Sequence, residues 1–129
     1  ELSHFFLETE KHHQREEEAI FPRLAAHGIT EPPEIFKEDH VEFKAKKKAL
    51  NEIVMHIENK SFQEFLELVS PIIEFLAKNL EEHIYKEDNI LYPIVNQTLE
   101  KSEWKDVRKK FDAIGYCCFA PADLGKKRK

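Results

Sequence analysis

The sequence predicts an all-α protein that forms one helical unit, with a short additional helix near the C-terminus. Only three of the 129 residues are glycine, which disfavours a turn-rich β sandwich and a glycine-rich phosphate-binding fold. Apolar residues make up 41% of the chain, enough for one core, and charged residues make up 35%. Long segments repeat apolar residues with the helical period of about 3.6, whereas strand alternation never extends beyond a few residues.

The first two predicted helices are bounded by glycine and proline. The first covers residues 2–26 and ends before Gly28, because glycine readily adopts the left-handed conformation that closes a helix. The second begins at Pro32-Pro33, where proline is tolerated in a first turn, and runs to about Glu58.

The third predicted helix is the longest. Ser61 and Glu64 have the spacing of a capping box, and the helical apolar pattern continues from there past Asn89. Pro71 interrupts this pattern and marks either a fresh helix start or a kink within one helix. We expect a kink.

A shorter helix and an irregular tail complete the chain. Ser102 is the expected cap of a helix over residues 103–114. We therefore assign residues 1–115 to one helical bundle and residues 116–129 to an irregular tail with a basic end. The adjacent pair Cys117-Cys118 suits neither a disulfide framework nor a zinc site of paired cysteines, so we expect both thiols to be reduced.

The charge pattern limits the possible partners and the compartment. The formal net charge is -5, and outside the basic segment 125–129 the two signs are interspersed, which disfavours nucleic-acid binding. No apolar run approaches the roughly eighteen residues of a membrane span, and the first residues do not resemble a signal peptide. We expect a cytoplasmic protein that does not enter the membrane.

Polar residues interrupt the apolar stripes of the three long helices. The stripe of the first helix includes His12 and Glu16, that of the second includes His40, and that of the third includes His83 and Glu87. Burying an ionised carboxylate costs several kcal/mol unless it is paired or bound to a cation. Two such carboxylates facing one interior therefore indicate a positive charge between them.

The spacing of these residues indicates a metal site. On the first and third predicted helices the histidine precedes its glutamate by four residues, so the two side chains of each pair leave the same helix face. The two segments also form an internal repeat, residues 12–22 and 83–93, in which histidine, glutamate, an aromatic residue and proline recur at identical offsets. Imidazole and carboxylate ligands suit iron, manganese or zinc, and the scarcity of thiolates disfavours an iron–sulfur cluster.

Other polar residues have simpler interpretations. His13 and Glu17 form a second pair with the same spacing on the first helix, and we expect them to face solvent while keeping them as an alternative register. The run Lys46-Lys47-Lys48 is expected to be a solvated helix face. An isolated histidine on an apolar stripe is more often a hydrogen-bonded core residue, and the paired carboxylates are what favour metal binding here.

These motifs resemble the hemerythrin-like, or HHE cation-binding, domain family. Both repeated segments match its His-x-x-x-Glu pattern followed by an aromatic residue and proline, and the single His40 after Asp39 resembles its third-helix histidine. The closing segment 103–116 resembles a bacterial and archaeal subgroup in which this domain is joined to other modules. The resemblance implies an up-and-down antiparallel helical bundle, a four-helix bundle with a non-haem di-iron centre in which the histidines are terminal ligands and the glutamates are bridges. The implied ligands are His12, Glu16, His40, His83 and Glu87.

The resemblance implies a domain that binds or senses a small oxidant such as O2, NO or peroxide, more a metal-binding sensor than an enzyme. Zinc or manganese are possible instead of iron. Two alternatives stay open: a di-iron peroxidase or oxidase, and a metal-free structural bundle in which the same residues form buried ion pairs.

The chain departs from the family pattern at two places. The family has an additional helix, with its own histidine, ahead of the segment that begins here at Leu2, so we expect a bundle that lacks or shares one helix. A homodimer, or a helix or domain from a longer protein, would then complete it. Lys44 stands one turn after His40, where oxygen-carrying hemerythrins have another histidine, which argues against reversible oxygen transport.

Overall fold

The computed structural model of the chain describes residues 9–116, which contain helices and no strand. The predicted all-α class is therefore confirmed. Predictions for residues 1–8 and for residues 117–129, including both cysteines, lie outside the described residues. The described elements, in chain order, are α2 (Glu10–Arg15), the π-helical turn η1 (Glu16–Ile20), α3 (Phe21–Ala26), α4 (Glu31–Met55), the 3-10 turn η2 (Ile57–Asn59), α5 (Phe62–Lys86), the π-helical turn η3 (Glu87–Leu91), α6 (Tyr92–Thr98) and α7 (Lys101–Ile114).

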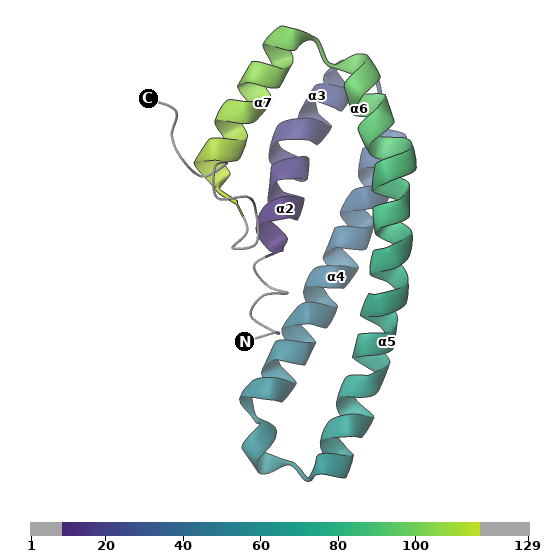
Figure 1. Cartoon of the computed structure of the whole chain (residues 1–129), viewed down its shortest axis with the longest axis vertical. Helices are drawn as coiled ribbons and strands as arrows, with labels where there is room; N and C mark the ends of the chain where they lie inside the picture. The colour runs from purple at the N-terminus through teal and green to yellow at the C-terminus, as the bar shows by residue number, and fades with distance from the viewer. Residues whose placement is uncertain (1–8, 117–129) are drawn as a thin grey trace.

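The helices alternate in direction and form an up-and-down arrangement (Figure 1). α2, η1 and α3 follow one another as one continuous helix, and so do α5, η3 and α6. α4 packs against α5, and α7 packs against α2 and η1. Within the described part of the chain, α4 and α5 form the long hairpin of the molecule, and the other helices gather around one end of it.

Most helix ends follow the predicted signals. Gly28 and Gly115 both have the positive φ expected where a helix closes, at 80° and 93°. Ser61 caps α5 in a complete capping box with Glu64, since its hydroxyl accepts the backbone N–H of Glu64 while the Glu64 carboxylate accepts the N–H of Ser61. α5 continues through Pro71 without a break, so the alternative of a fresh helix start there is wrong.

The cap of the last helix differs from the prediction. Glu100, with extended backbone angles, forms the capping box with Glu103, and α7 begins at Lys101. Ser102 therefore lies inside the first turn. The Glu100 N–H donates to the Glu103 carboxylate at 2.8 Å, and the cap residue is Glu100 in place of the predicted Ser102.

The two π-helical turns were not predicted, because the periodicity suggested unbroken α-helix. The N–H of Phe21 bonds the carbonyl of Glu16, and the N–H of Tyr92 bonds the carbonyl of Glu87, each five residues back. Proline is the second residue after each turn, and it has no N–H and crowds the carbonyl of the preceding turn. The wider π turn accommodates this defect inside a continuous helix.

The buried apolar side chains fall into two clusters. The first core cluster lies where α7 and α6 meet the first helix; its buried members are Ala19, Ile20, Phe21, Leu24, Phe36, Leu91, Val95, Leu99 and Val107. The second core cluster lies between α4 and α5; its buried members are Phe43, Leu50, Val69 and Leu76. Among the described helices, none has the length and apolarity needed to cross a bilayer.

Candidate metal centre

A layer of polar side chains separates the two core clusters. The ring of His83 lies edge-on to Phe36 of the first cluster and to Phe43 of the second, with ring centroids 5.1 Å apart in both cases. His83 is itself only 2% exposed. Around His83 the polar layer is therefore walled by aromatic rings and shielded from bulk water.

Two carboxylates occupy the centre of this layer. Glu16 and Glu87 begin the two π-helical turns and are 2% and 5% exposed. The Nε2 atom of His12 lies 2.8 Å from Oε1 of Glu16 and 3.3 Å from Oε1 of Glu87. One imidazole thus contacts both carboxylates from one side.

Two further imidazoles approach the carboxylates from α4 and α5. Nε2 of His40 lies 3.3 Å from Oε2 of Glu16, and Nε2 of His83 lies 3.0 Å from Oε1 of Glu87. Ligand atoms from Glu16, Glu87, His40 and His83 all lie within 4.8 Å of one another, a spacing that could hold a metal ion. The structure therefore brings together all five residues that the sequence singled out.

A second layer of carboxylates orients the histidines. Nδ1 of His40 lies 3.1 Å from Oε1 of Glu17, and Nδ1 of His83 lies 3.0 Å from Oδ2 of Asp39. When a carboxylate accepts the Nδ1 proton, Nε2 is left as a lone-pair donor. In that tautomer, Nε2 of each histidine offers its lone pair on the side of Glu16 and Glu87.

The inner polar atoms are left without hydrogen bonds. Among the described residues, the buried atoms Oε2 of Glu16, Nε2 of His40 and Nε2 of His83 make none, although they lie close together. Buried polar groups rarely stay unsatisfied unless water or an ion completes them. Two carboxylates and several imidazoles are a donor set that fits iron, zinc or manganese.

The electrostatics of the layer match a site built for positive charge. Burial opposes protonation of His12, but its bonds to Glu16 and Glu87 outweigh burial and raise its pKa to about 10. Burial likewise disfavours the charged form of His83, yet Glu87 and Asp39 raise its pKa. Burial raises and the histidines lower the pKa of Glu16, with a net lowering. Protons on the histidines therefore balance the carboxylates when no cation does.

Two residues are placed differently from the prediction. His13, expected to face solvent, is 5% exposed, and its ring stacks on that of His40 with centroids 4.0 Å apart and an interplanar angle of 9°. Lys47, expected on a solvated face, is 1% exposed; its Nζ donates to Thr9 Oγ1 at 2.6 Å and to Glu10 Oε1 at 3.2 Å. Burial lowers the pKa of His13.

The sequence contained a signal for both residues. Positions 13, 16, 20 and 24 follow one helical face as well as 12, 16, 20 and 24 do, so adjacency hid which histidine is the more buried. Lys47 lies four residues after Phe43 and three before Leu50, on the buried stripe of α4. The prediction placed Lys47 in solvent because of its charge, although its position on the helix indicated burial.

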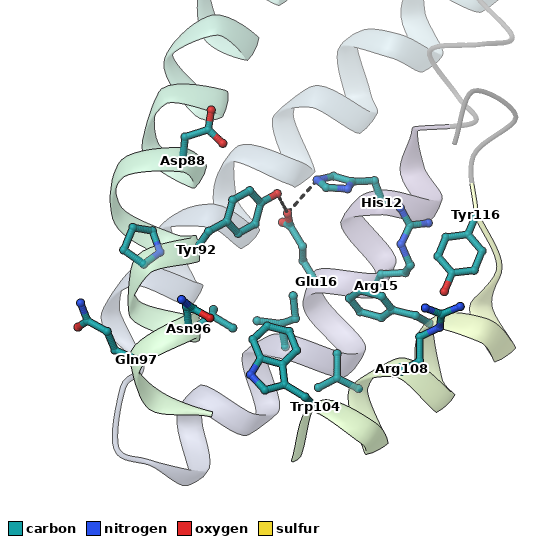
Figure 2. Close-up of a pocket in the computed structure, with 15 residues that line it drawn as sticks. His12, Arg15, Glu16, Asp88, Tyr92, Asn96, Gln97, Trp104, Arg108 and Tyr116 are labelled. Carbon is teal, nitrogen blue, oxygen red and sulfur yellow. Dashed lines mark hydrogen bonds and ion pairs between the residues drawn. The ribbon is translucent and has the colours of Figure 1, made fainter. Parts of the chain in front are cut away.

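A cavity of about 1010 Å³ opens beside the polar layer, between α7 and the two continuous helices (Figure 2). His12 and Tyr92 point toward the carboxylate of Glu16, and the Tyr92 hydroxyl donates to Glu16 Oε1 at 3.3 Å. Much of the remaining wall is apolar or aromatic, from Ile20, Val95, Trp104, Val107 and Phe111. The layer is therefore accessible from this side to a small molecule.

Arg15 helps form the far wall of this cavity. Its guanidinium donates to the carbonyl of Gly115 at 2.8 Å and lies over the rings of Phe111 and Tyr116, 5.7 and 5.1 Å from their centroids. The side chain thereby ties α2 to the end of α7 and keeps that side of the cavity in place.

Comparison with known proteins supports the chemistry of the layer. A family model described as the hemerythrin HHE cation binding domain matches residues 1–95, about three quarters of the chain. This segment includes every residue of the polar layer described above. No curated protein and no solved structure matches the chain.

Proposed function

The chain belongs to the hemerythrin HHE cation-binding domain family, and we propose that it holds a non-haem di-iron centre that binds or senses a small oxidant such as dioxygen, nitric oxide or peroxide. One observation carries the proposal. Glu16, Glu87, His40 and His83 are buried, aim ligand atoms at one point, and leave the inner atoms of Glu16, His40 and His83 without hydrogen bonds.

Each residue has a distinct role in the proposed site. His12, His40 and His83 would hold the metal through their imidazoles, and Glu16 and Glu87 would hold it through their carboxylates and neutralise its charge. Iron, once bound, supplies an open coordination position and redox chemistry. Zinc or manganese would suit the same donors but would favour a structural or different reactive role.

The surrounding residues prepare the ligands. Glu17 and Asp39 hold the Nδ1 protons of His40 and His83, which fixes the ring orientation and directs Nε2 inward. Tyr92 donates to one oxygen of Glu16 and so restrains the carboxylate plane. Burying these carboxylates and imidazoles costs desolvation free energy, which a bound cation would offset.

The cavity beside His12 is the proposed entry for the oxidant. Its apolar wall suits a small uncharged molecule, and His12 is the most exposed ligand, with 37% of its side chain accessible. A small uncharged molecule in this cavity would reach His12 and Glu16 directly, since both side chains line it.

Metal content of the chain, purified without chelator and then reconstituted anaerobically with Fe(II), tests the metal centre. We expect close to two irons per chain and near-ultraviolet absorption after oxidation. The double variant His12→Ala, Glu87→Ala should lose this iron. The matched control Glu18→Ala, His56→Ala changes the same residue types at exposed positions and should keep it. A wild-type chain that retains no iron, zinc or manganese contradicts the proposal and favours the metal-free bundle of buried ion pairs.

Nitric oxide tests the small-molecule part separately. Added anaerobically to the Fe(II)-loaded chain, it should change the visible spectrum in proportion to the iron bound. An unchanged spectrum contradicts oxidant binding and leaves the metal centre intact. Steady consumption of peroxide with an added electron donor would instead support the enzyme alternative.

A further inference from the structure

The cavity of Figure 2 is far larger than a small oxidant requires. Its volume is about 1010 Å³, whereas one water molecule occupies roughly 30 Å³ of the liquid and a diatomic molecule is of similar size. Pockets that hold organic ligands have volumes of about 300–1,000 Å³. The cavity therefore has room for an organic molecule of roughly ten non-hydrogen atoms or more.

One charged side chain in the wall of this cavity is buried without a carboxylate partner. Of the three arginines in the described part of the chain, two are well exposed and paired. Arg23 pairs with Asp106 and is 33% exposed, and Arg108 pairs with Asp112 and is 43% exposed. Arg15 is only 9% exposed, yet within residues 9–116 no carboxylate forms an ion pair with it. Burying a charge is costly unless it is paired, so Arg15 is suited to an anionic ligand.

The guanidinium of Arg15 is fixed in position by contacts that leave further N–H groups for a ligand. It has five N–H groups, and one nitrogen donates to the carbonyl of Gly115 at 2.8 Å. The rings of Phe111 and Tyr116 lie against it and restrict its rotamers. A guanidinium matches the two oxygens of a carboxylate, and one that is already ordered loses little entropy on binding.

Charge and apolar surface are separated along the cavity. Figure 2 shows Arg15 and Arg108 beside Tyr116 at one end, whereas the carboxylate of Asp88 stands apart from them. Apolar and aromatic side chains form much of the rest of the wall, namely Ile20, Val95, Trp104, Val107 and Phe111. The cavity thus combines a positive end with an apolar length, which is the complement of an amphiphilic anion.

We propose that this cavity binds an organic acid with an apolar body of about eight carbons, whose carboxylate pairs with Arg15 and whose apolar body lies against Trp104 and its apolar neighbours. The inference goes beyond the proposed metal centre, because binding in this way needs no cation. An acid in the cavity also lies beside His12 and Glu16, in the space through which the small oxidant would pass.

Trp104 provides the measurement, because it is the single tryptophan of the chain and lines the cavity. Octanoate should shift its fluorescence emission to shorter wavelength in a saturable way, in the full chain as purified and again after chelator treatment. Uncharged 1-octanol should bind about 10-fold more weakly or worse, because it forms no charge-assisted hydrogen bonds with Arg15. Octanoate binding that disappears on chelation would show that the carboxylate binds the metal, and would overturn the inference while supporting a metal centre.

Arg15→Gln tests the anion contact. The glutamine amide removes the charge and keeps an N–H donor for the carbonyl of Gly115. Octanoate should bind this variant about 10-fold more weakly or worse, and 1-octanol should bind it like the wild type. The control Arg23→Gln removes an arginine outside the cavity wall and should leave both affinities unchanged. Equal octanoate affinity in Arg15→Gln and the wild type, or equal affinity of the wild type for octanoate and 1-octanol, overturns the inference.

Asn96→Phe tests the position of the apolar body and decides the matter if Arg15→Gln does not fold. Asn96 is an exposed residue of α6 that lines the cavity, so the larger ring should narrow it and weaken octanoate and 1-octanol alike. Gln63→Phe, at an exposed position of α5 outside the cavity, should weaken neither. Unchanged affinities in Asn96→Phe overturn the cavity as the binding site. Emission from Trp104 that responds to protein concentration and not to octanoate would show that a second copy of the chain covers the cavity, which also overturns the inference.

Discussion

Glu16 and Glu87 occupy equivalent positions in two repeated segments, and both carboxylates contact the same atom, Nε2 of His12, at 2.8 and 3.3 Å. Each glutamate begins a π-helical turn, and each turn is followed by proline at the second position of the next α-helical segment. The repeat is thus a repeat of backbone geometry as well as of sequence. It brings two carboxylates from helices far apart in the chain to one point.

Metal binding should release protons. The pKa of His12 is raised to about 10, so this imidazole is protonated at neutral pH and must lose its proton before it can coordinate. Affinity for Zn(II) should therefore rise between pH 6 and pH 9. Calorimetry in buffers of different ionisation enthalpy measures the protons released. A buffer-independent enthalpy would contradict this expectation, and His12→Gln should release fewer protons than the wild type.

The stability of the metal-free chain should decline in alkali. His12 has a folded-state pKa of about 10 against an ordinary value of 6.5, so the folded chain holds the proton more tightly than the unfolded chain. Its contribution is complete below about pH 6.5 and is lost as the pH rises toward 10. Urea unfolding of the chelator-treated chain at pH 6, 8 and 10 measures this loss. The His12→Gln variant should show a shallower decline.

Acid should destabilise the metal-free chain through Glu16. Burial raises the pKa of this carboxyl and the bonded histidines lower it, with a net value below the ordinary 4.5. Its contribution is therefore present above about pH 4.5 and is lost as the pH falls further. Unfolding curves at pH 5, 4 and 3 should show a smaller loss for Glu16→Gln than for the wild type. An equal acid dependence in both would show that other carboxylates dominate.

Tyr92→Phe isolates one hydrogen bond of the polar layer. The variant removes the donor to Glu16 Oε1, which keeps its contact with His12. We expect a loss of about 0.5–1.5 kcal/mol in the free energy of unfolding without metal. Tyr85→Phe is the matched control, because Tyr85 is 67% exposed. If both variants unfold like the wild type, the hydroxyl of Tyr92 contributes nothing to the layer.

Leu91→Ala tests how the second π turn places its side chains. Leu91 is completely buried in the first core cluster, whereas its neighbour Ile90 is 44% exposed. The leucine variant should lose about 2–5 kcal/mol of unfolding free energy, as core truncations do. Ile90→Ala should change it far less. Similar losses in the two variants would contradict the described register of this turn.

The apolar period and the capping residues predict most of the fold. They locate the helices because burial and capping act over one or two turns, which a sequence displays directly. The register after each π turn is harder to predict. After the second π turn, Val95 is the buried residue at 1% exposure and the preceding Ile94 is half-buried, which the helical stripe through His83 and Glu87 does not decide in advance. The extra residue in the π turn rotates the following segment relative to an ideal α-helix.

The site residues that could be predicted from the sequence are those in which a histidine is followed by a glutamate four residues later. His12 with Glu16 and His83 with Glu87 stood out because the carboxylate four residues on makes a core histidine improbable. The carboxylates behind the histidines did not stand out, since Glu17 and Asp39 look like ordinary surface residues in a highly charged helix. Lys47 was missed because its charge is compensated by Thr9 and Glu10, residues from another helix end. Such compensation depends on tertiary contacts.

The separation of the apolar side chains into two core clusters affects how the chain unfolds. Among the described residues, the second core cluster is built by α4 and α5 alone, while the first combines Phe36 of α4 with side chains of the other helices. His40 and His83 lie at the junction of the two, on the same pair of long helices. Amides beyond this junction should exchange with solvent through local opening that leaves the first cluster intact. A cation held by residues from three helices would link the two parts, and so determine whether the chain unfolds in one cooperative step or in two.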